Sequence, residues 1–220
     1  MKLQTKELCK SYGQSVILNQ IDLAAETGQS ISISGPSGCG KSTLMSIMGL
    51  LLRPDSGGLW LDGQQISDWS DKQKSALRRR RFGFIFQSAQ LIGSSTVLEN
   101  VMIPAVLSRD RGRKARACQL LEQFGLADRM DYYPHQLSFG QTRRVSVARA
   151  LLMEPDFVFA DEPTNDLDEA NAWEIGKILL DLPRQGKALI LTTHDKAFAA
   201  KADRRFVFDK QGALLSVENE

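Results

Sequence analysis

Cysteine is scarce in this sequence, with three residues among 220. Cys9, Cys39 and Cys118 are odd in number and show no CxxC pair or other metal-ligand spacing. This pattern argues against a disulfide framework and against a zinc site. We therefore expect the protein to work in a reducing cytosol.

Net charge is also nearly absent. The formal charge is +2, from 28 basic and 26 acidic residues, so the whole molecule offers no electrostatic footprint for nucleic acid. Positive charge gathers only in Arg78 to Arg81, which with Lys72 and Lys74 lies in a polar stretch predicted to be a helix ending before a strand. Such runs are most often a solvated face, and contact with acidic lipid or a partner is the alternative.

Long apolar runs are missing as well. The first residues, MKLQTKELCKSYG, lack the apolar core of a signal peptide, and the longest apolar stretch, near Leu44 to Leu52, is too short to span a bilayer. If the protein acts at a membrane, we expect another chain to supply the membrane part. The composition, 42% hydrophobic and 25% charged, is that of a globular protein. A chain of 220 residues is long enough to bury a sizeable core without stabilising disulfides or metal ions.

Short apolar segments bounded by polar or turn residues predict buried parallel strands. These segments are Ser30 to Ser34, Gly83 to Gln87, Phe157 to Asp161 and Ala188 to Thr193. Gly58 to Asp62 with the following Gly63, and Phe206 to Leu215 around Gly212, have the pattern of antiparallel hairpins. The predicted fold is α/β, with a mixed, mainly parallel sheet and a small antiparallel sheet beside it.

Helical signals replace strand signals between about residues 88 and 141. Arg113 to Phe124 is the clearest segment, because its apolar residues recur at helical spacing. No repeat or low-complexity linker separates this region from the rest. We predict one domain over residues 1–220, with a core formed by 1–87 and 142–220 and an α-helical subdomain over 88–141.

A phosphate-binding loop is the sharpest motif. GPSGCGKST fits G-x-x-x-x-G-K-[ST] between a predicted strand and a helix predicted over Lys41 to Leu51, so a chance glycine-rich turn is a poor alternative. Backbone N–H groups and the helix N-terminus favour phosphate, Lys41 reaches the terminal phosphates, and the Ser42 hydroxyl ligates magnesium. The predicted nucleotide-binding residues here are Gly35, Pro36, Ser37, Gly38, Cys39, Gly40, Lys41, Ser42 and Thr43.

Two acids end the apolar strand FVFADE. Asp161 is placed to hold a magnesium ion, and Glu162 is placed to orient or deprotonate an attacking water. Taken alone, an acidic pair after a strand is more often a helix cap or a surface turn. A further motif is needed to decide between these interpretations.

That motif is LSFGQ, Leu137 to Gln141, which is followed by TRRVSVARALLMEPD and then by the acidic strand. With the phosphate loop before it, and over essentially the full length, the sequence resembles the ATP-binding-cassette (ABC) ATPases. The resemblance implies a P-loop NTPase core with a RecA-like arrangement, ATP and Mg²⁺ as cofactors, and a homodimer closed around two ATP. In that dimer Ser138, Gly140 and Gln141 bind the ATP held by the opposite subunit.

The resemblance assigns further roles. It implies that Tyr12 stacks on adenine, that Gln87 senses magnesium and the transport partner, that Asp168 is the D-loop aspartate, and that His194 is the switch histidine at the γ-phosphate. Alone, Tyr12 would more often be a packing residue and His194 a structural histidine. Their positions in the ordered set of motifs favour the functional roles, and Glu162, His194, Gln87 and Lys41 form the predicted catalytic set.

One residue departs from the family pattern. Phe139 stands where the family's signature usually has the first of two glycines. The serine, the second glycine and the glutamine are intact, so we expect an active enzyme in which Phe139 alters closed-dimer geometry or turnover rate. Within the family, SALRRRRFGFIFQSAQLIGSSTVLENVMIPAVL resembles the branch of lipoprotein-release, macrolide-export and cell-division ATPases, and amino-acid importers share part of this pattern.

The resemblance implies an ATPase that drives separate permease subunits of a membrane transporter of export or extraction type. The permease would dock in the groove near Gln87 and the helical subdomain, so the protein would lie peripherally on the inner face of the cell membrane. The alternatives are a regulator that transmits force to a membrane or periplasmic partner without transport, and an importer ATPase. A soluble ABC protein acting on ribosomes or DNA fits poorly, because the chain has one cassette and no coiled-coil insertion.

Overall fold

A six-stranded sheet runs through the centre of the molecule. The computed structural model describes residues 1–209 and 211–217. The strand order is β10-β9-β3-β8-β7-β6, in which β9, β3, β8, β7 and β6 are parallel and β10 pairs antiparallel with β9. The strands are β3 (Ser30–Ser34), β6 (Phe82–Ile85), β7 (Phe157–Asp161), β8 (Ala188–Thr192), β9 (Arg204–Phe208) and β10 (Leu214–Val217).

The predicted central strands are confirmed with small shifts. β3 and β7 have the predicted bounds, β8 ends one residue earlier than predicted, and β6 covers Phe82–Ile85 instead of Gly83 to Gln87. Strand pairing to β7 ends at Ile85, so Gln87 lies in a loop beyond the sheet. The late hairpin is present as β9 and β10, and residues 210 and 218–220 of the predicted core lie outside the described residues.

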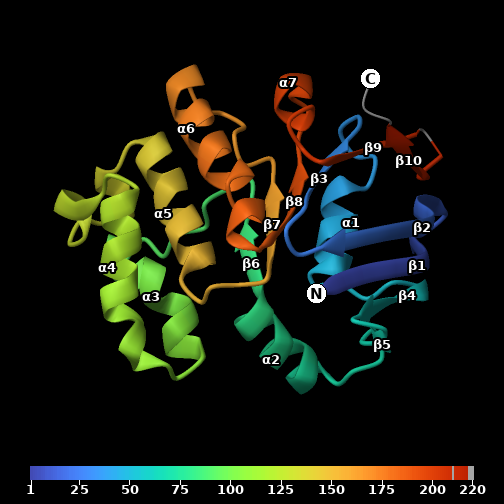
Figure 1. The fold of residues 1–220 in the computed structure, drawn as a ribbon, viewed down its shortest axis with the longest axis horizontal. Coiled ribbons are helices and arrows are strands. Elements are labelled where there is room, and N and C mark those ends of the chain that lie inside the picture. Colours follow the sequence, from blue (N-terminus) through green and yellow to red (C-terminus); the bar gives the residue numbers. More distant parts are fainter. Residues whose placement is uncertain (210, 218–220) are drawn as a thin grey trace.

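Both faces of this sheet are buried, and period-two alternation assigns residues to the two faces. Phe157 and Phe159 of β7 pack in one apolar cluster with α1 (Lys41–Met48) and the antiparallel sheet. Val158 and Ala160 pack in a second cluster with the other helices. Figure 1 shows α1 and α5 (Phe139–Leu151) on opposite sides of the central strands.

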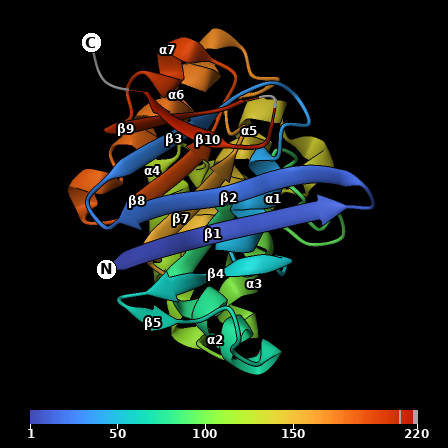
Figure 2. The same cartoon turned by 90° about the vertical axis from the view of Figure 1, so that its right-hand side faces the viewer.

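A second, antiparallel sheet has the strand order β2-β1-β4-β5 and lies along one side of the molecule, as Figure 2 shows. Its strands are β1 (Lys2–Tyr12), β2 (Ser15–Glu26), β4 (Ser56–Leu61) and β5 (Gln64–Gln65). The sequence predicted only the hairpin of β4 and β5. In β1 and β2 register shifts after Thr5 and Leu8 interrupt the alternation, and Glu7 and Gln20 adopt positive φ, so the pattern was not recognised.

The predicted helical region is confirmed, since residues 86–156 contain no strand. Its helices are α3 (Val97–Leu107), α4 (Lys114–Gln123) and α5, with 3₁₀ turns at Arg111–Arg113, Ala127–Arg129 and Pro134–Gln136. Thr96 with Glu99, and Ser138 with Gln141, form capping boxes that start α3 and α5. The residue boundary at 141 falls inside α5, and the division into subdomains stays a prediction.

The helix after the phosphate loop is shorter than predicted, because α1 ends at Met48 instead of Leu51. A Cβ on Gly49 would lie 2.5 Å from the Phe84 ring, and Leu50 turns the chain away with a φ of 59°. The remaining helices are α2 (Asp71–Arg81), α6 (Glu169–Leu180), the 3₁₀ turn Pro183–Gln185 and α7 (Lys196–Ala199). Within the described residues no helix is both long and apolar enough to cross a membrane.

The basic run lies at the end of α2 as predicted, and two of its arginines contact neighbouring segments of the fold. Arg81 forms an ion pair with Asp156 at 2.8 Å, and Arg78 donates to the Leu50 carbonyl at 2.7 Å. Arg79 and Arg80 remain exposed. Two of the four arginines thus anchor α2 to its neighbours.

Close packing of α5 on β6 requires glycine at position 83, because a Cβ there would lie 2.5 Å from the Ala150 carbonyl oxygen and 2.9 Å from the Pro155 ring. We expect Gly83→Ala to lower the free energy of unfolding by about 1–3 kcal/mol, the usual cost of overpacking. Urea titration followed by circular dichroism measures the change. Gly93→Ala is the control, since a Cβ there meets nothing within 4 Å, and equal stability of the two variants would contradict the prediction.

Candidate active site

The phosphate loop connects β3 to α1 with a backbone that side chains would obstruct. Gly40, the residue before α1, has a φ of 109°, and a Cβ on it would lie 2.9 Å from the Ile17 carbonyl oxygen. No side chain of the described residues caps α1, and no acid lies in its first turn. The first N–H groups of α1 are therefore directed to an anion, as in phosphate sites at helix N-termini.

Lys41 lies over this loop. Its ammonium donates to the carbonyls of Gly35 at 2.9 Å and Pro36 at 3.0 Å, and the residue is 9% exposed. The ammonium also lies 4.0 Å from the Cys39 Sγ, so its three protons all have a partner and hold the side chain across the loop. The loop thus combines fixed positive charge with open backbone donors.

The two acids after β7 are held by Thr192, the last residue of β8. The buried Thr192 hydroxyl donates to Asp161 Oδ1 at 2.6 Å and accepts the backbone N–H of Glu162 at 3.1 Å. The Glu162 N–H also reaches the Thr192 carbonyl at 3.1 Å. Glu162 has a φ of 46°, which is strained for a residue other than glycine and is typical of functional positions.

Glu162 meets His194 across the ends of β7 and β8. Oε2 of Glu162 accepts the backbone N–H of His194 at 3.3 Å and lies 3.0 Å from its Nδ1. The Glu162 side chain is 13% exposed and that of His194 is 65% exposed. The carboxylate is thus held in a fixed orientation beside an accessible imidazole.

A cavity of about 560 Å³ brings together nine of the predicted residues, whereas the predicted Cys39, Gly40, Thr43 and Asp161 are not in its lining. Sequence reasoning missed one of its residues, Asn165, although it stands in the same segment as the predicted Asp168. Asn165 follows the strained turn at Glu162 and donates to Asp166 at 3.1 Å. The residues lining the cavity are Gly35, Pro36, Ser37, Gly38, Lys41, Ser42, Gln87, Glu162, Asn165 and His194.

The predicted signature residues lie outside the lining of this cavity, at the start of α5. The exposed Ser138 accepts the Gln141 N–H at 3.3 Å, and Gln141 Oε1 accepts the Ser138 N–H at 2.9 Å. Gly140 is buried, and a Cβ on it would lie 2.4 Å from Asn171 Oδ1. A side chain at position 140 would therefore have to displace the Asn171 side chain from its contacts with Asp168 and Arg144.

Two other predicted residues also lie apart from the cavity lining. Tyr12 ends β1 with 54% of its surface exposed, and the Lys10 ammonium lies 5.6 Å from its ring centroid. Asp168 starts α6 and accepts from the backbone and side chain of Asn171. These hydrogen bonds hold the pKa of the Asp168 carboxyl below its usual range.

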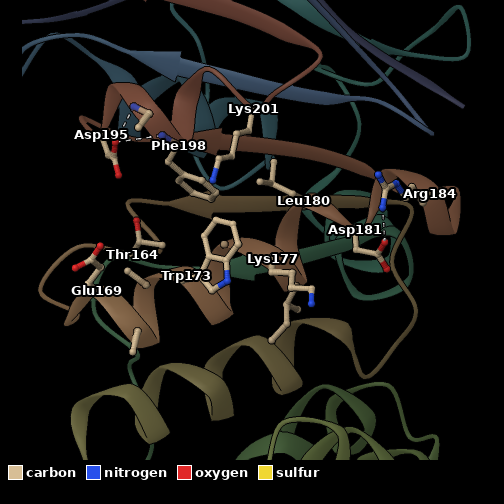
Figure 3. A pocket seen from close by; sticks show the side chains of 15 residues that line it. Thr164, Glu169, Trp173, Lys177, Leu180, Asp181, Arg184, Asp195, Phe198 and Lys201 are labelled. Carbon is tan, nitrogen blue, oxygen red and sulfur yellow. Dashed lines mark hydrogen bonds and ion pairs between the residues drawn. The ribbon is translucent and has the colours of Figure 1, made fainter.

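A larger groove of about 1180 Å³ lies between α6 and α7 and is shown in Figure 3. Trp173 and Phe198 line it, and the Lys201 ammonium lies 4.2 Å from the Trp173 ring centroid. This groove has no phosphate loop in its lining. The smaller cavity is the candidate nucleotide site, because the donors suited to a triphosphate line it and not the larger groove.

Oxygen donors suited to magnesium are present near the phosphate loop. Ser42 and Gln87 line the cavity, and Asp161 ends β7 beside Glu162. No group of three or more His, Cys, Asp and Glu residues able to hold a metal occurs in the part of the chain that the structure describes. A hydroxyl, an amide and one carboxylate fit an ion that takes its other ligands from water and substrate phosphates, as Mg²⁺ does.

Comparison with known proteins agrees with this geometry. The family model of the ABC transporter matches residues 18–165. A LolD ATP-binding protein of a lipoprotein-releasing system from Bacteroides fragilis is 42% identical over 90% of this chain and 93% of its own. A macrolide-export MacB protein of Rhodopseudomonas palustris is 48% identical over 86% of this chain, which spans 29% of that relative's length.

Solved structures extend the likeness to the whole chain. The dimeric structure of MJ0796, a bacterial ABC transporter cassette, has a TM-score of 0.90 and 33% identity over 99% of both chains. A post-hydrolysis state of that cassette bound to ADP and Pi has a TM-score of 0.86. Both the predicted fold and the predicted resemblance are confirmed. The chain belongs to the ABC transporter family, as one of its ATP-binding and ATP-hydrolysing cassettes.

Proposed function

We propose that two copies of this chain close around two ATP molecules and that each ATP is held between the phosphate loop of one copy and Ser138, Gly140 and Gln141 of the other. The observation that carries this proposal is that, within one chain, the signature residues lie apart from the cavity at the phosphate loop. Lys41 and Glu162 meet in the cavity, whereas Ser138 lies at the exposed start of α5, outside its lining. A second copy completes the site, and the dimeric form of the matched cassette supports this arrangement.

Within each site the residues have separate tasks. The N–H groups of loop 35–43 and the Lys41 ammonium bind the phosphates, and Tyr12 stacks on the adenine from the exposed end of β1. Asn165, in the segment that follows Glu162, lines the cavity on the side of Glu162 and His194, and Asp168 follows it at the start of α6. Phe139, which is 55% exposed beside Ser138, faces the same interface.

Hydrolysis uses Glu162 and His194. Glu162 accepts a proton from the water that attacks the γ-phosphorus, and the bond to the ADP oxygen breaks as the new P–O bond forms. His194 presents Nδ1 to Glu162, which leaves Nε2 for the γ-phosphate. Because ADP and phosphate are both anions, their charges repel across the closed interface and reopen the dimer.

Magnesium fits the donor set of Ser42, Asp161 and Gln87, and when bound it neutralises phosphate charge as the P–O bond breaks. Thr192 fixes the Asp161 carboxylate by donating to one of its oxygens. The other oxygen then stays free to act as a ligand. Gln87, in the loop after β6, contributes its side-chain amide oxygen.

A separate groove of about 360 Å³ lies beside the loop that contains Gln87. Its floor is apolar, with Phe84 and Phe86 stacked at 5.7 Å, and its wall includes Leu107 of α3. Arg78, Arg79 and Arg149 also line it, and no carboxylate does. We propose that a segment of a membrane permease docks here, which would place the protein peripherally on the inner face of the cell membrane.

The names of the relatives bear on the direction of transport. Relatives named for macrolide export and for lipoprotein release support an export or extraction system. The chain spans 29% of the MacB relative and 93% of the LolD relative. ATP closure would drive the conformational change in the permease.

Glu162→Gln tests the proposed mechanism. We expect ATP turnover to fall about 10²- to 10⁴-fold, the range for losing a general base, while ATP binding persists. Because the closed dimer then cannot hydrolyse its ATP, light scattering after gel filtration with Mg-ATP should show twice the monomer mass. Glu122→Gln, an exposed neutralisation on α4, is the control, and a monomeric Glu162→Gln protein with full turnover would overturn the mechanism.

Thr192→Val tests the link between the two acids. Valine keeps the shape of the buried residue but removes the hydroxyl that contacts Asp161 and the Glu162 N–H. We expect kcat to fall roughly tenfold, or about 1.4 kcal/mol of activation free energy, because Asp161 loses its hydroxyl donor while the Glu162 N–H keeps the Thr192 carbonyl. Thr193→Val, which removes a neighbouring hydroxyl that accepts from Asp195, should leave kcat within about twofold, and equal losses in both variants would refute the assigned role.

A further inference from the structure

Helix α5 holds the loop that contains Gln87 with two arginines. Arg143 donates to the carbonyls of Phe86 at 2.6 Å and Gln87 at 2.5 Å. Arg149 donates to those of Ala89 at 2.7 Å and Gln90 at 2.9 Å. Four carbonyls within five consecutive residues are thereby fixed to one helix.

Arg143 has an unusual environment for a cation. It is 1% exposed, and no carboxylate within the described residues forms an ion pair with it at 4.0 Å or less. Burial lowers the pKa of its guanidinium, and the charge of Asp166 opposes this shift. Arginine stays protonated under these conditions, so the two carbonyls solvate a buried charge and are costly to displace.

The guanidinium fork explains why this residue is an arginine. Two parallel N–H donors reach two successive carbonyls at once, which a single ammonium does not do with the same geometry. Burial leaves the group no water to replace a lost partner. Displacing the Gln87 carbonyl would therefore leave one donor of the buried guanidinium without an acceptor.

Phe139 is a further neighbour of Arg143. The guanidinium carbon lies 5.9 Å from the centroid of the Phe139 ring, one helical turn earlier on α5. Phe139 stands between Ser138 and Gly140, which act on the ATP of the partner subunit if the proposed function holds. Arg143 therefore contacts both the signature segment and the Gln87 backbone.

We infer that Arg143 is a positioning residue that couples the signature segment of α5 to Gln87. The inference rests on the proposed function. When Ser138 and Gly140 engage the ATP of the partner subunit, the first turn of α5 is fixed, and Arg143 transmits that position to the Gln87 carbonyl and hence to the side chain in the cavity. Each copy thus adjusts its own phosphate site to the ATP bound by the other copy.

The test is a double-mutant cycle between Arg143→Lys and Gln87→Ala on steady-state ATP hydrolysis. Lysine keeps the positive charge but lacks the two guanidinium N–H donors that bind both carbonyls at once. We therefore expect kcat to fall about tenfold and KM for ATP to change less than about twofold. If Arg143 acts through Gln87, the same substitution in the Gln87→Ala background should change kcat less than about twofold. A tenfold loss in both backgrounds, or no loss in the first, would overturn the inference.

Arg113→Lys is the matched control. Arg113, whose side chain is 31% exposed, likewise binds two partners, Asp110 at 2.9 Å and Glu154 at 2.6 Å, and neither lies in the loop that contains Gln87. Arg113→Lys should leave kcat unchanged while its thermal stability is comparable to that of Arg143→Lys. If Arg143→Lys does not fold, Phe139→Leu replaces it, with an expected loss of roughly threefold that again disappears without Gln87. Absence of ATP hydrolysis by the unmodified protein would instead overturn the proposed function.

Discussion

The arrangement of the site depends on the hydrogen bonds of the Thr192 hydroxyl. This hydroxyl joins the ends of β7 and β8 by donating to Asp161 and accepting from the Glu162 N–H. Because parallel strands end at the same edge of a sheet, Thr192 at the end of β8 can contact both consecutive acids at the end of β7. The strained φ of Glu162 is tolerated because both Thr192 and His194 hold the residue.

The phosphate loop reaches the same edge by the same topology. β3 pairs with β8, so the loop that follows Ser34 opens beside the residues that follow Thr192. Lys41 and His194 come from segments more than 150 residues apart and line one cavity. The parallel sheet, buried on both faces, therefore brings the residues of this cavity together, whereas Tyr12 at the end of β1 lies outside its lining.

Helix α5 links this edge to the rest of the molecule. Its first turn carries Ser138, its middle holds the Gln87 backbone through Arg143, and it packs on β6 where Gly83 leaves no space for a side chain. Gly140 permits the approach to α6, where Asn171 fixes Asp168. One helix thus contacts both the loop that contains Gln87 and the start of α6.

The sequence by itself determined the family, the central strands and most of the phosphate site, because those depend on local patterns such as GPSGCGKST, FVFADE and LSFGQ. It did not reveal β1 and β2, whose bulges break the alternation that identifies strands. Nor did it reveal Asn165, Thr192 or Arg143, since a polar residue in an apolar stretch or a basic helix has no local signature of what it contacts. Those roles arise from contacts 30 to 60 residues apart in sequence, such as Thr192 with Asp161 and Arg143 with Gln87, and only the tertiary structure decided them.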